Sequence, residues 1–214
     1  MDFLPKKIEQ YACNHTQQEN PILAELNRET WAKVLIPRML SGHLQGRVLS
    51  MFSKMIRPKC ILEIGTYTGY SAICLSEGLV EGGQLHTIDI NEELKSMSSK
   101  YFKKAEISKN VVQYVGNALE IIPNMKDEFD LVFIDADKEN YSNYFKIVIE
   151  KMLIGGFIIA DNVLWSGKVI EKDKEKDHET KAIQEFNNLI QSSKRVENIL
   201  MPIRDGLMIC QKIK

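Results

Sequence analysis

The chain has 214 residues, 44% of them hydrophobic, and its 28 basic residues nearly balance its 29 acidic residues. This length and apolar content are enough for one large α/β domain with a single core. The near-neutral balance argues against the large uniform field that drives non-specific binding to nucleic acids or membranes, while leaving room for a local basic patch.

The sequence shows neither a pattern typical of a membrane-targeting segment nor cysteines at the spacing of a metal site or a disulfide framework. No apolar run follows the N-terminal lysines, and no stretch approaches the roughly 20 apolar residues of a membrane span. The four cysteines lie far apart, without a C-x-x-C pair or a histidine at zinc-finger spacing. We therefore expect a cytoplasmic protein with reduced thiols and no membrane partner.

The first quarter of the chain has a helical pattern. From Pro21 to about Arg57, apolar residues recur at spacings of three, four and five. This pattern predicts amphipathic helices that are broken near Pro37 and Gly42. We expect one domain over residues 1–214, with an N-terminal helical extension over 1–57 and the core over 58–214.

After Pro58, short β-rich runs alternate with helical segments, which predicts a parallel sheet with helices on both faces. The predicted strands are 60–64, 84–90, 111–115, 130–135, 156–161, 195–201 and 207–212. Only residues 202–206 separate the last two, and so short a connection can join antiparallel strands but not parallel ones. The sheet should therefore finish in an antiparallel hairpin.

The segment LEIGTYTGYS, residues 62–71, is typical of a buried strand, a tight glycine turn and the start of a helix. Open α/β sheets bind ligands at the carboxyl ends of strands, where a glycine such as Gly65 lets the backbone approach the ligand. The next predicted strand brings Asp89 to the same edge, about 20 residues further on, where an acidic side chain commonly binds ribose. Asp89 is therefore predicted to bind the ribose of a nucleoside cofactor.

The glycine turn argues against a dinucleotide. Tyr67 and Tyr70 stand at the second and third glycine positions of the G-x-G-x-x-G fingerprint, so a pyrophosphate would be crowded. S-adenosylmethionine has no phosphates, and Glu63 lies where it can help to anchor the amino-acid end of that cofactor. A turn that binds no ligand stays open as the alternative.

Two later strands end in oxygen-bearing side chains. Asp135 ends one strand, and Asp161 with Asn162 ends the following one. Neighbouring parallel strands would bring these side chains together. Two carboxylates and an amide oxygen suit a hard cation such as Mg²⁺, Mn²⁺ or Ca²⁺ better than zinc. The alternative is that these residues only cap a helix and open a turn.

Six segments resemble the cation-dependent O-methyltransferases, which include catechol and caffeoyl-CoA O-methyltransferases and their small bacterial relatives. In chain order they are LEIGTYTGYSAICLS, HTIDIN, GNALEIIP, FDLVFIDADKENY, GGFIIADNVLWSGKV and PIRDGL. The resemblance covers nearly the whole chain. It implies a Rossmann-like, seven-stranded, mostly parallel sheet with an antiparallel last strand, S-adenosylmethionine as cofactor, and a homodimer.

The resemblance also implies roles for individual residues. The implied cofactor contacts are Ser41, Glu63, Gly65, Tyr67, Ser71, Asp89, Ala118 and Asp135. The implied metal ligands are Asp135, Asp161 and Asn162, and Mg²⁺ is the metal expected first. Lys138 matches the proposed general base and acts with Asp135 in catalysis, which requires its pKa to fall well below about 10.4. The alternative is a solvated lysine paired with Glu139 or Asp137, and Asp137 itself either orients Lys138 or approaches the cofactor.

The implied reaction is methyl transfer to a hydroxyl of a catechol-like or phenolic small molecule, free or as its CoA thioester. A relative that methylates a 5-hydroxyuridine of tRNA shares every catalytic residue, so it is the main alternative; a basic track of residues 168, 172, 174, 176 and 204 would favour it. Two remote alternatives remain. A nicotinamide-dependent oxidoreductase is disfavoured because the chain lacks the G-x-G-x-x-G fingerprint. A non-catalytic nucleoside-binding protein is disfavoured because it would not need the oxygens of Asp135, Asp161 and Asn162.

The charged segment 165–181 is expected to begin at the rim of the acceptor pocket, because it follows the metal ligands directly. Trp165 is predicted to form an apolar wall for a planar ring. Arg204, where many relatives carry glycine, is a second predicted substrate contact. The alternative is that this segment is a solvated loop leading into a helix.

Overall fold

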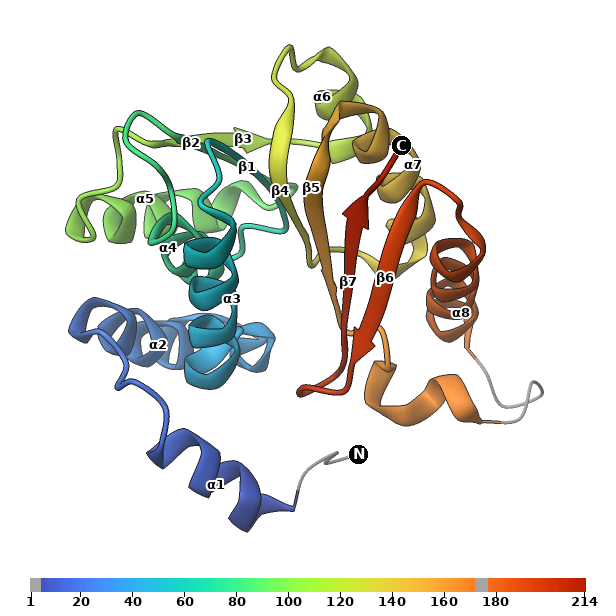
Figure 1. Cartoon of the computed structure of the whole chain (residues 1–214). Helices are drawn as coiled ribbons and strands as arrows, with labels where there is room; N and C mark the ends of the chain where they lie inside the picture. Colours follow the sequence, from blue (N-terminus) through green and yellow to red (C-terminus); the bar gives the residue numbers. More distant parts are fainter. Residues whose placement is uncertain (1–4, 172–176) are drawn as a thin grey trace.

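A seven-stranded sheet forms the centre of the protein, as Figure 1 shows. The computed structural model describes residues 5–171 and 177–214. The order of the strands is β3-β2-β1-β4-β5-β7-β6. Their bounds are β1 Cys60–Ile64, β2 Gln84–Asp89, β3 Val111–Val115, β4 Phe129–Ile134, β5 Met152–Asp161, β6 Val196–Met201 and β7 Leu207–Lys212.

The predicted pairing directions are confirmed. Strands β1 to β5 pair in parallel. Strand β7 lies antiparallel between β5 and β6, so the chain ends in the expected hairpin. This is the Rossmann-like arrangement that the sequence implies.

The start of β5 differs from the prediction. This strand begins at Met152 rather than Gly156, and its register against β4 shifts between Phe129 and Leu131. Gly155 has a φ of 87°, a conformation that other residues rarely adopt. Because glycine is depleted in regular strands, the Gly155–Gly156 pair interrupts the strand pattern, and the first residues of β5 are not recognisable in the sequence.

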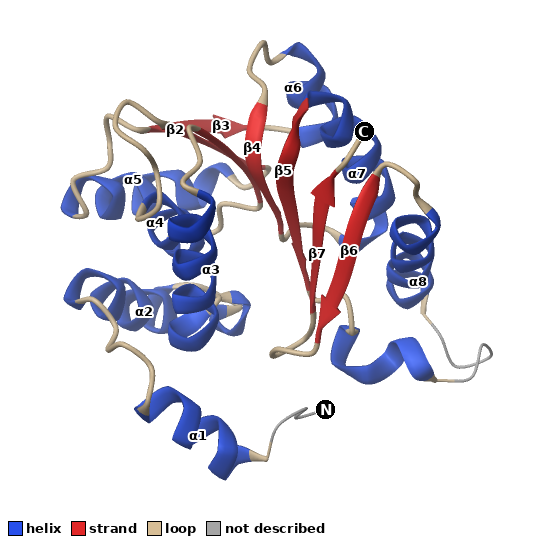
Figure 2. Cartoon of the chain, viewed as in Figure 1, coloured by secondary structure: helices blue, strands red, loops and turns tan. Residues whose placement is uncertain are grey.

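Helices cover both faces of the sheet, as Figure 2 shows. Helices α2 to α5 pack on one face and α6 to α8 on the other, and each face has its own apolar core. The bounds are α1 Lys6–Asn14, α2 Pro21–Lys33, α3 Gly42–Ile56, α4 Tyr70–Ser76, α5 Lys95–Lys104, α6 Ala118–Asn124, α7 Tyr141–Lys151 and α8 His178–Ser192. The 3-10 helices in the described residues are η1 Pro37–Met39, η2 Glu92–Leu94, η3 Lys138–Asn140 and η4 Trp165–Ile170.

The N-terminal helices break where the sequence predicts. The Asn20 side chain accepts a hydrogen bond from the Ile22 N–H at 2.8 Å and caps α2, with Pro21 in the first turn. Helix α3 starts at Gly42 after the short η1. Helix α1 lies inside the predicted extension 1–57 but has no bounds of its own in the prediction, because all of its residues are at least partly exposed and none joins a core.

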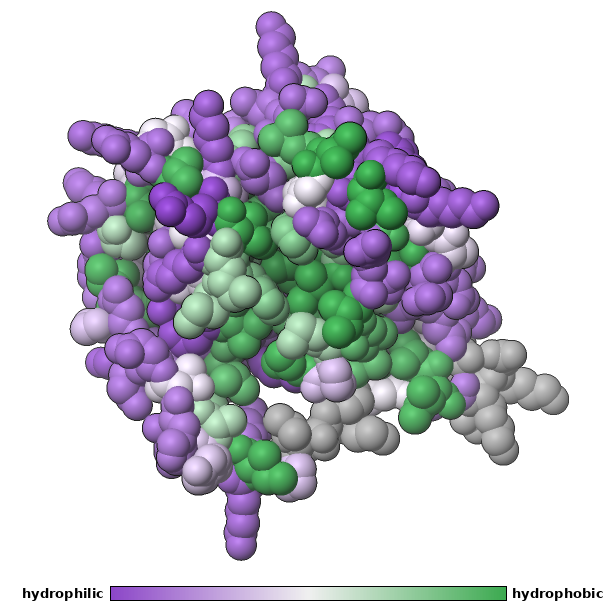
Figure 3. Space-filling view, viewed as in Figure 1, coloured by the Kyte–Doolittle hydropathy of each residue, from purple (hydrophilic) through white to green (hydrophobic). Residues whose placement is uncertain are grey.

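Apolar side chains gather in the middle of the face drawn in Figure 3. Large apolar side chains that stay more than half exposed include Trp31 on α2, Met51 and Met55 on α3, and Ile199 on β6. Trp31 therefore does not pack into the core of its own chain. No described helix combines the length and apolar character needed to cross a bilayer.

Candidate active site

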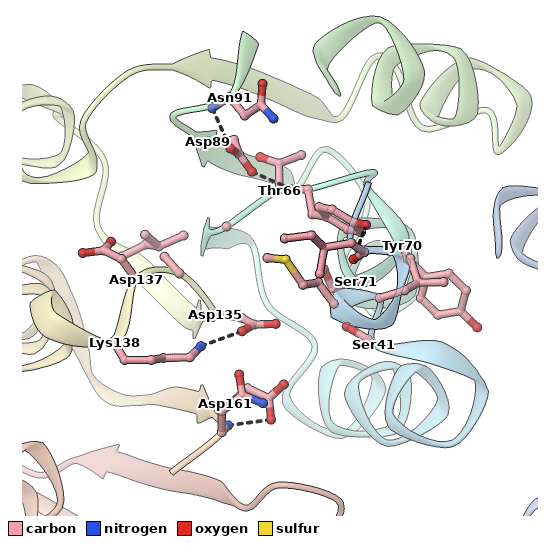
Figure 4. Close-up of a pocket in the computed structure, with 18 of the residues that line it drawn as sticks. Ser41, Thr66, Tyr70, Ser71, Asp89, Asn91, Asp135, Asp137, Lys138 and Asp161 are labelled. Atoms are coloured by element: carbon pink, nitrogen blue, oxygen red, sulfur yellow. Dashed lines mark hydrogen bonds and ion pairs between the residues drawn. The ribbon is translucent and has the colours of Figure 1, made fainter. Parts of the chain in front are cut away.

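A cavity of about 1430 Å³ opens at the carboxyl edge of the sheet. Figure 4 shows Asp89 at one end of this cavity, Asp161 at the other and Asp135 between them. Every predicted site residue except Glu63 lines the cavity: Ser41, Gly65, Tyr67, Ser71, Asp89, Ala118, Asp135, Lys138, Asp161, Asn162, Trp165 and Arg204. The shared edge of parallel strands brings these residues together, as expected.

Gly65 permits a close approach between the ends of β1 and β4. Its φ is 107°, and a Cβ atom at this position would lie 2.0 Å from the Asp135 carbonyl oxygen. Tyr67, two residues later, also has a positive φ, of 49°. Such a backbone is uncommon outside glycine and costs free energy, so the surrounding contacts must hold it.

Asp89 holds the turn through backbone hydrogen bonds. Its Oδ2 accepts from the Tyr67 N–H at 2.6 Å, and its Oδ1 accepts from the Asn91 N–H at 2.8 Å. The carboxylate is thus fixed in place, and each oxygen keeps a further lone pair. These lone pairs are available to the hydroxyls of a bound ribose.

Glu63 lies beneath the turn as a fully buried carboxyl group. Its Oε2 accepts a hydrogen bond from the Thr87 hydroxyl at 2.6 Å, whereas Oε1 has no hydrogen-bond partner among the described residues. Burial raises the pKa of Glu63 to about 8, and the Ser71 and Thr87 side chains offset only part of that rise. A buried carboxyl oxygen without a partner fits a cationic amine.

Asp161 and Asp135 place two carboxylates at the other end of the cavity. Asp161 is buried; its Oδ2 accepts from the Gln45 amide at 2.6 Å and its Oδ1 from the Asn162 N–H at 2.7 Å. Burial, together with the nearby charge of Asp135, raises the pKa of Asp161 to about 7. Like charges held together in a buried site favour a bound cation, and carboxylate and amide oxygens are the ligands of a hard one.

Lys138 reaches into this end of the cavity from η3. Its Nζ donates to Asp135 Oδ1 at 3.1 Å and to the Tyr141 hydroxyl at 2.7 Å, and its residue is only 7% exposed. The Trp165 ring centroid lies 5.7 Å from the same Nζ. The alternative of a solvated Lys138 is therefore wrong.

The two acidic neighbours of Lys138 have other partners. Asp137 accepts hydrogen bonds from the Tyr144 hydroxyl and the Asn140 amide, and Figure 4 shows its side chain pointing away from Asp135. Glu139 pairs with His178 at 3.0 Å. The interpretation that Asp137 orients Lys138 is not supported by these contacts.

Gln45 is a site residue that the sequence analysis missed. Its amide nitrogen donates to Asp161, and its Oε1 accepts from Arg204 Nη1 at 3.0 Å. The same Arg204 nitrogen donates to the Ser41 carbonyl oxygen. The only signal in the sequence is a polar residue on the buried side of an amphipathic helix, and that signal does not name its partner.

The segment after the metal end begins as a 3-10 helix rather than as a simple loop. Trp165 has a φ of 46°, and its buried Nε1 finds no hydrogen-bond partner in residues 5–171 and 177–214. Lys168 Nζ lies 5.9 Å from the Trp165 ring centroid and pairs with Asp177 at 2.7 Å. The other three predicted basic contacts, Lys172, Lys174 and Lys176, lie outside the described residues.

Comparisons with known proteins show which family this chain resembles in sequence and in fold. Residues 13–213 match the family model described as O-methyltransferase. Caffeoyl-CoA O-methyltransferase from Medicago sativa is 35% identical over 208 residues, which cover 92% of this chain and 84% of that enzyme. The O-methyltransferase from Bacillus cereus, solved in complex with SAH, is 30% identical with a TM-score of 0.89 and coverage of 96% and 97%. The O-methyltransferase TomG from Streptomyces achromogenes, solved with SAM, is 25% identical with a TM-score of 0.88 and coverage of 97% and 96%.

Proposed function

The chain belongs to the O-methyltransferase family and is an S-adenosylmethionine-dependent O-methyltransferase, and from this premise we propose that its methyl transfer depends on a divalent cation. The acceptor is a hydroxyl of a catechol-like or phenolic small molecule, free or as its CoA thioester. One observation carries the metal dependence: the buried Asp161 carboxylate and the partly exposed Asp135 carboxylate share the end of the cavity with the Asn162 amide.

The cofactor is proposed to lie along the upper part of the cavity, over the glycine turn. Asp89 binds the ribose hydroxyls with its remaining lone pairs, and Glu63 Oε1 accepts a hydrogen bond from the amine of the amino-acid end. The other proposed contacts come from residues that line the cavity: Ser41, Gly65, Tyr67, Ser71, Ala118 and Asp135.

Asp135, Asp161 and Asn162 are proposed to hold the cation, with Mg²⁺ as the first candidate. A bound cation supplies one chemical effect here: it lowers the pKa of an acceptor hydroxyl and fixes its orientation. Gln45 keeps the Asp161 carboxylate in place, and Arg204 keeps Gln45 in place. In many metal sites, residues that do not touch the metal hydrogen-bond to its ligands and fix their orientation, and Gln45 and Arg204 are proposed to do this for Asp161.

The residues of the chain align the reactants and receive a proton. Bound S-adenosylmethionine would supply its methyl group, so that a C–O bond to the acceptor would form as the C–S bond breaks and the electron pair stays on sulfur. Lys138 Nζ, which lies beside Asp135, is the proposed acceptor of the hydroxyl proton. Alignment in the cavity removes translational and rotational freedom before the reaction and so lowers the barrier.

The proposed acceptor contacts are Trp165 and Arg204, which line the cavity next to the metal end. A planar ring can pack on Trp165. Methylation of tRNA is not favoured by the described basic residues, because Lys168 pairs with Asp177 and Arg204 is engaged with Ser41 and Gln45.

The proposal is tested with labelled S-adenosylmethionine and a panel of acceptors: catechol, caffeic acid, caffeoyl-CoA and tRNA with an unmodified wobble uridine. Transfer to a vicinal diol that needs added Mg²⁺ supports the proposal, and transfer to tRNA alone contradicts it. Trp165→Ala should raise the KM for the acceptor more than the KM for the cofactor. The reverse result would remove Trp165 from the acceptor site.

Self-association is part of the same proposal. The exposed apolar side chains on α2 and α3 give the chain a surface that a second copy can cover. Light scattering at micromolar concentration should give twice the mass of one chain, and the mass of a single chain would contradict a homodimer.

A further inference from the structure

Three side chains of metal-binding types meet at the amino edge of the sheet, opposite to the cavity. Cys60 is the first residue of β1, His86 lies in β2, and Asp127 lies in the loop between α6 and β4. One possible ligand atom from each lies within 4.8 Å of the other two. Figure 1 shows the loop between α6 and β4 at the top, away from the N-terminal helices near the cavity. The methyl transfer proposed above uses none of the three residues.

His86 presents a buried nitrogen to this cluster. The residue is 4% exposed, and its Nδ1 lies 3.1 Å from the Tyr114 hydroxyl. Its Nε2 lies 3.9 Å from Asp127 Oδ2 and, within the part of the chain that the structure describes, has no hydrogen-bond partner. When Nδ1 donates to the Tyr114 oxygen, Nε2 keeps a free lone pair that faces the cluster. A hydrogen bond to the second ring nitrogen is the usual support of a metal-binding histidine.

Cys60 is fixed beside this nitrogen. The Asp130 carboxylate accepts hydrogen bonds from the backbone N–H groups of Lys59 and Cys60, both at 2.8 Å. Burial, together with the charges of Asp127 and Asp130, raises the pKa of the Cys60 thiol to about 12. A cation in the cluster would reverse this effect, because a coordinated thiol is deprotonated outright.

We propose that Cys60, His86 and Asp127 form a second metal site, which binds one zinc-type divalent cation. Thiolate, imidazole and carboxylate are the ligands of Zn²⁺, whereas Mg²⁺ prefers oxygen ligands alone. The thiolate and the carboxylate together balance the charge of the ion. Tetrahedral coordination sets ligand atoms roughly 3.3–3.8 Å apart, so ligand atoms that already lie within 4.8 Å of one another need side-chain movements of only about 1 Å to close the site.

The bound ion would join two neighbouring strands to the loop that enters β4. Three protein ligands leave the fourth position to water, which the exposed Asp127 lets in. Because the site exists only in the folded chain, ion binding should stabilise the fold. The site stands on its own geometry and does not depend on the acceptor or on the hard-cation site.

The test is a titration of the metal-free protein with Co²⁺ in the presence of excess Mg²⁺, which occupies oxygen-only sites. One equivalent of Co²⁺ should produce the near-ultraviolet absorption of a thiolate-to-cobalt charge transfer, and Zn²⁺ should displace it. Cys60→Ser should abolish this absorption. Cys13→Ser, which changes another partly exposed cysteine, should leave it intact.

Asp127→Asn changes only an exposed loop residue and gives a second measurement if Cys60→Ser fails to fold. It should weaken Co²⁺ binding by about tenfold or more. Zn²⁺ should also raise the Tm of the unmodified chain but not that of Cys60→Ser. The proposal is overturned by a missing charge-transfer absorption in the unmodified chain, by its persistence in Cys60→Ser, or by unchanged Co²⁺ affinity in Asp127→Asn.

Discussion

The two ends of the cavity are built differently. At the nucleoside end, the Asp89 carboxylate accepts two backbone hydrogen bonds and holds a turn whose backbone is strained at Tyr67. At the metal end, the carboxylates of Asp135 and Asp161 lie close enough for their charges to repel, and Lys138 offsets part of that repulsion.

This difference separates two tasks. Backbone hydrogen bonds hold the nucleoside end in shape before any ligand arrives, so it should bind the cofactor without help from a metal. The metal end gathers negative charge in a buried space, which is stable only when a proton or a cation balances it. Changes at the metal end should therefore affect the rate of methyl transfer, and changes at the nucleoside end should affect cofactor affinity.

The largest expected effect comes from removing the proposed base. Lys138→Met keeps the length of the side chain but removes the amine beside Asp135. We expect kcat to fall by about 10²- to 10⁴-fold, the usual contribution of general acid–base catalysis. Cofactor affinity, measured by calorimetry, should stay nearly constant. A Lys138→Met enzyme with unchanged kcat would restrict Lys138 to a structural role.

The next effect should come from the metal ligands. Asp161→Asn replaces a carboxylate ligand with a neutral amide, and Asn162→Ala removes an oxygen ligand. We expect each to lower metal affinity by at least about 10- to 100-fold, because the loss of a residue that only hydrogen-bonds to a ligand already has an effect of that size. Activity as a function of Mg²⁺ concentration measures this shift. Glu139→Gln, which changes an exposed carboxylate outside the cavity, is the matched control. A variant that keeps full turnover at low Mg²⁺ is not missing a ligand.

At the nucleoside end, Asp89→Ala should act on cofactor binding. The loss of charge-assisted hydrogen bonds to ribose should weaken S-adenosylmethionine binding by about 1–3 kcal/mol. Calorimetry measures this change directly, and the Mg²⁺ dependence of the remaining activity should not move. Unchanged cofactor affinity would remove Asp89 from the site.

The smallest effect concerns pH and Glu63. Its pKa rises from 4.5 to about 8 on folding, so the stability that its protonated form contributes is fully present below 4.5 and is lost as pH rises through about 8. The Tm of the cofactor-free protein should therefore fall between pH 5 and pH 8, and Glu63→Gln should flatten that fall by a few degrees. Glu81→Gln, an exposed control, should leave it unchanged. Parallel curves for Glu63→Gln and the unmodified chain would contradict the assignment.

The sequence predicted most of the fold because its strongest patterns are local. Apolar strands bounded by glycine or proline placed all seven strands within a few residues, and the short connection between β6 and β7 required antiparallel pairing. The bounds of helix α1 within the extension 1–57 were not predicted because the helix buries no side chain, and β5 was shortened because two glycines interrupt its pattern.

The candidate site was predictable only in part, because some of its contacts join residues that are far apart in the sequence. Asp89, Asp135 and Asp161 lie at the carboxyl ends of strands, and parallel strands share an edge, so their meeting could be inferred from order alone. Gln45 reaches Asp161 across 116 positions from a helix, and no periodicity records such a contact. Cys60, His86 and Asp127 form a cluster only after β1, β2 and the loop before β4 come together in the fold.

The claim that the metal end serves chemistry and the nucleoside end serves cofactor binding is tested most directly on one metal-stripped preparation. Methyl transfer to a vicinal diol and S-adenosylmethionine affinity are measured before and after Mg²⁺ is returned. Transfer should be abolished and then restored by Mg²⁺ alone, while cofactor affinity stays within about threefold, or less than about 0.7 kcal/mol. Full transfer in excess chelator, or a loss of cofactor binding that parallels the loss of transfer, would contradict the division between the two ends.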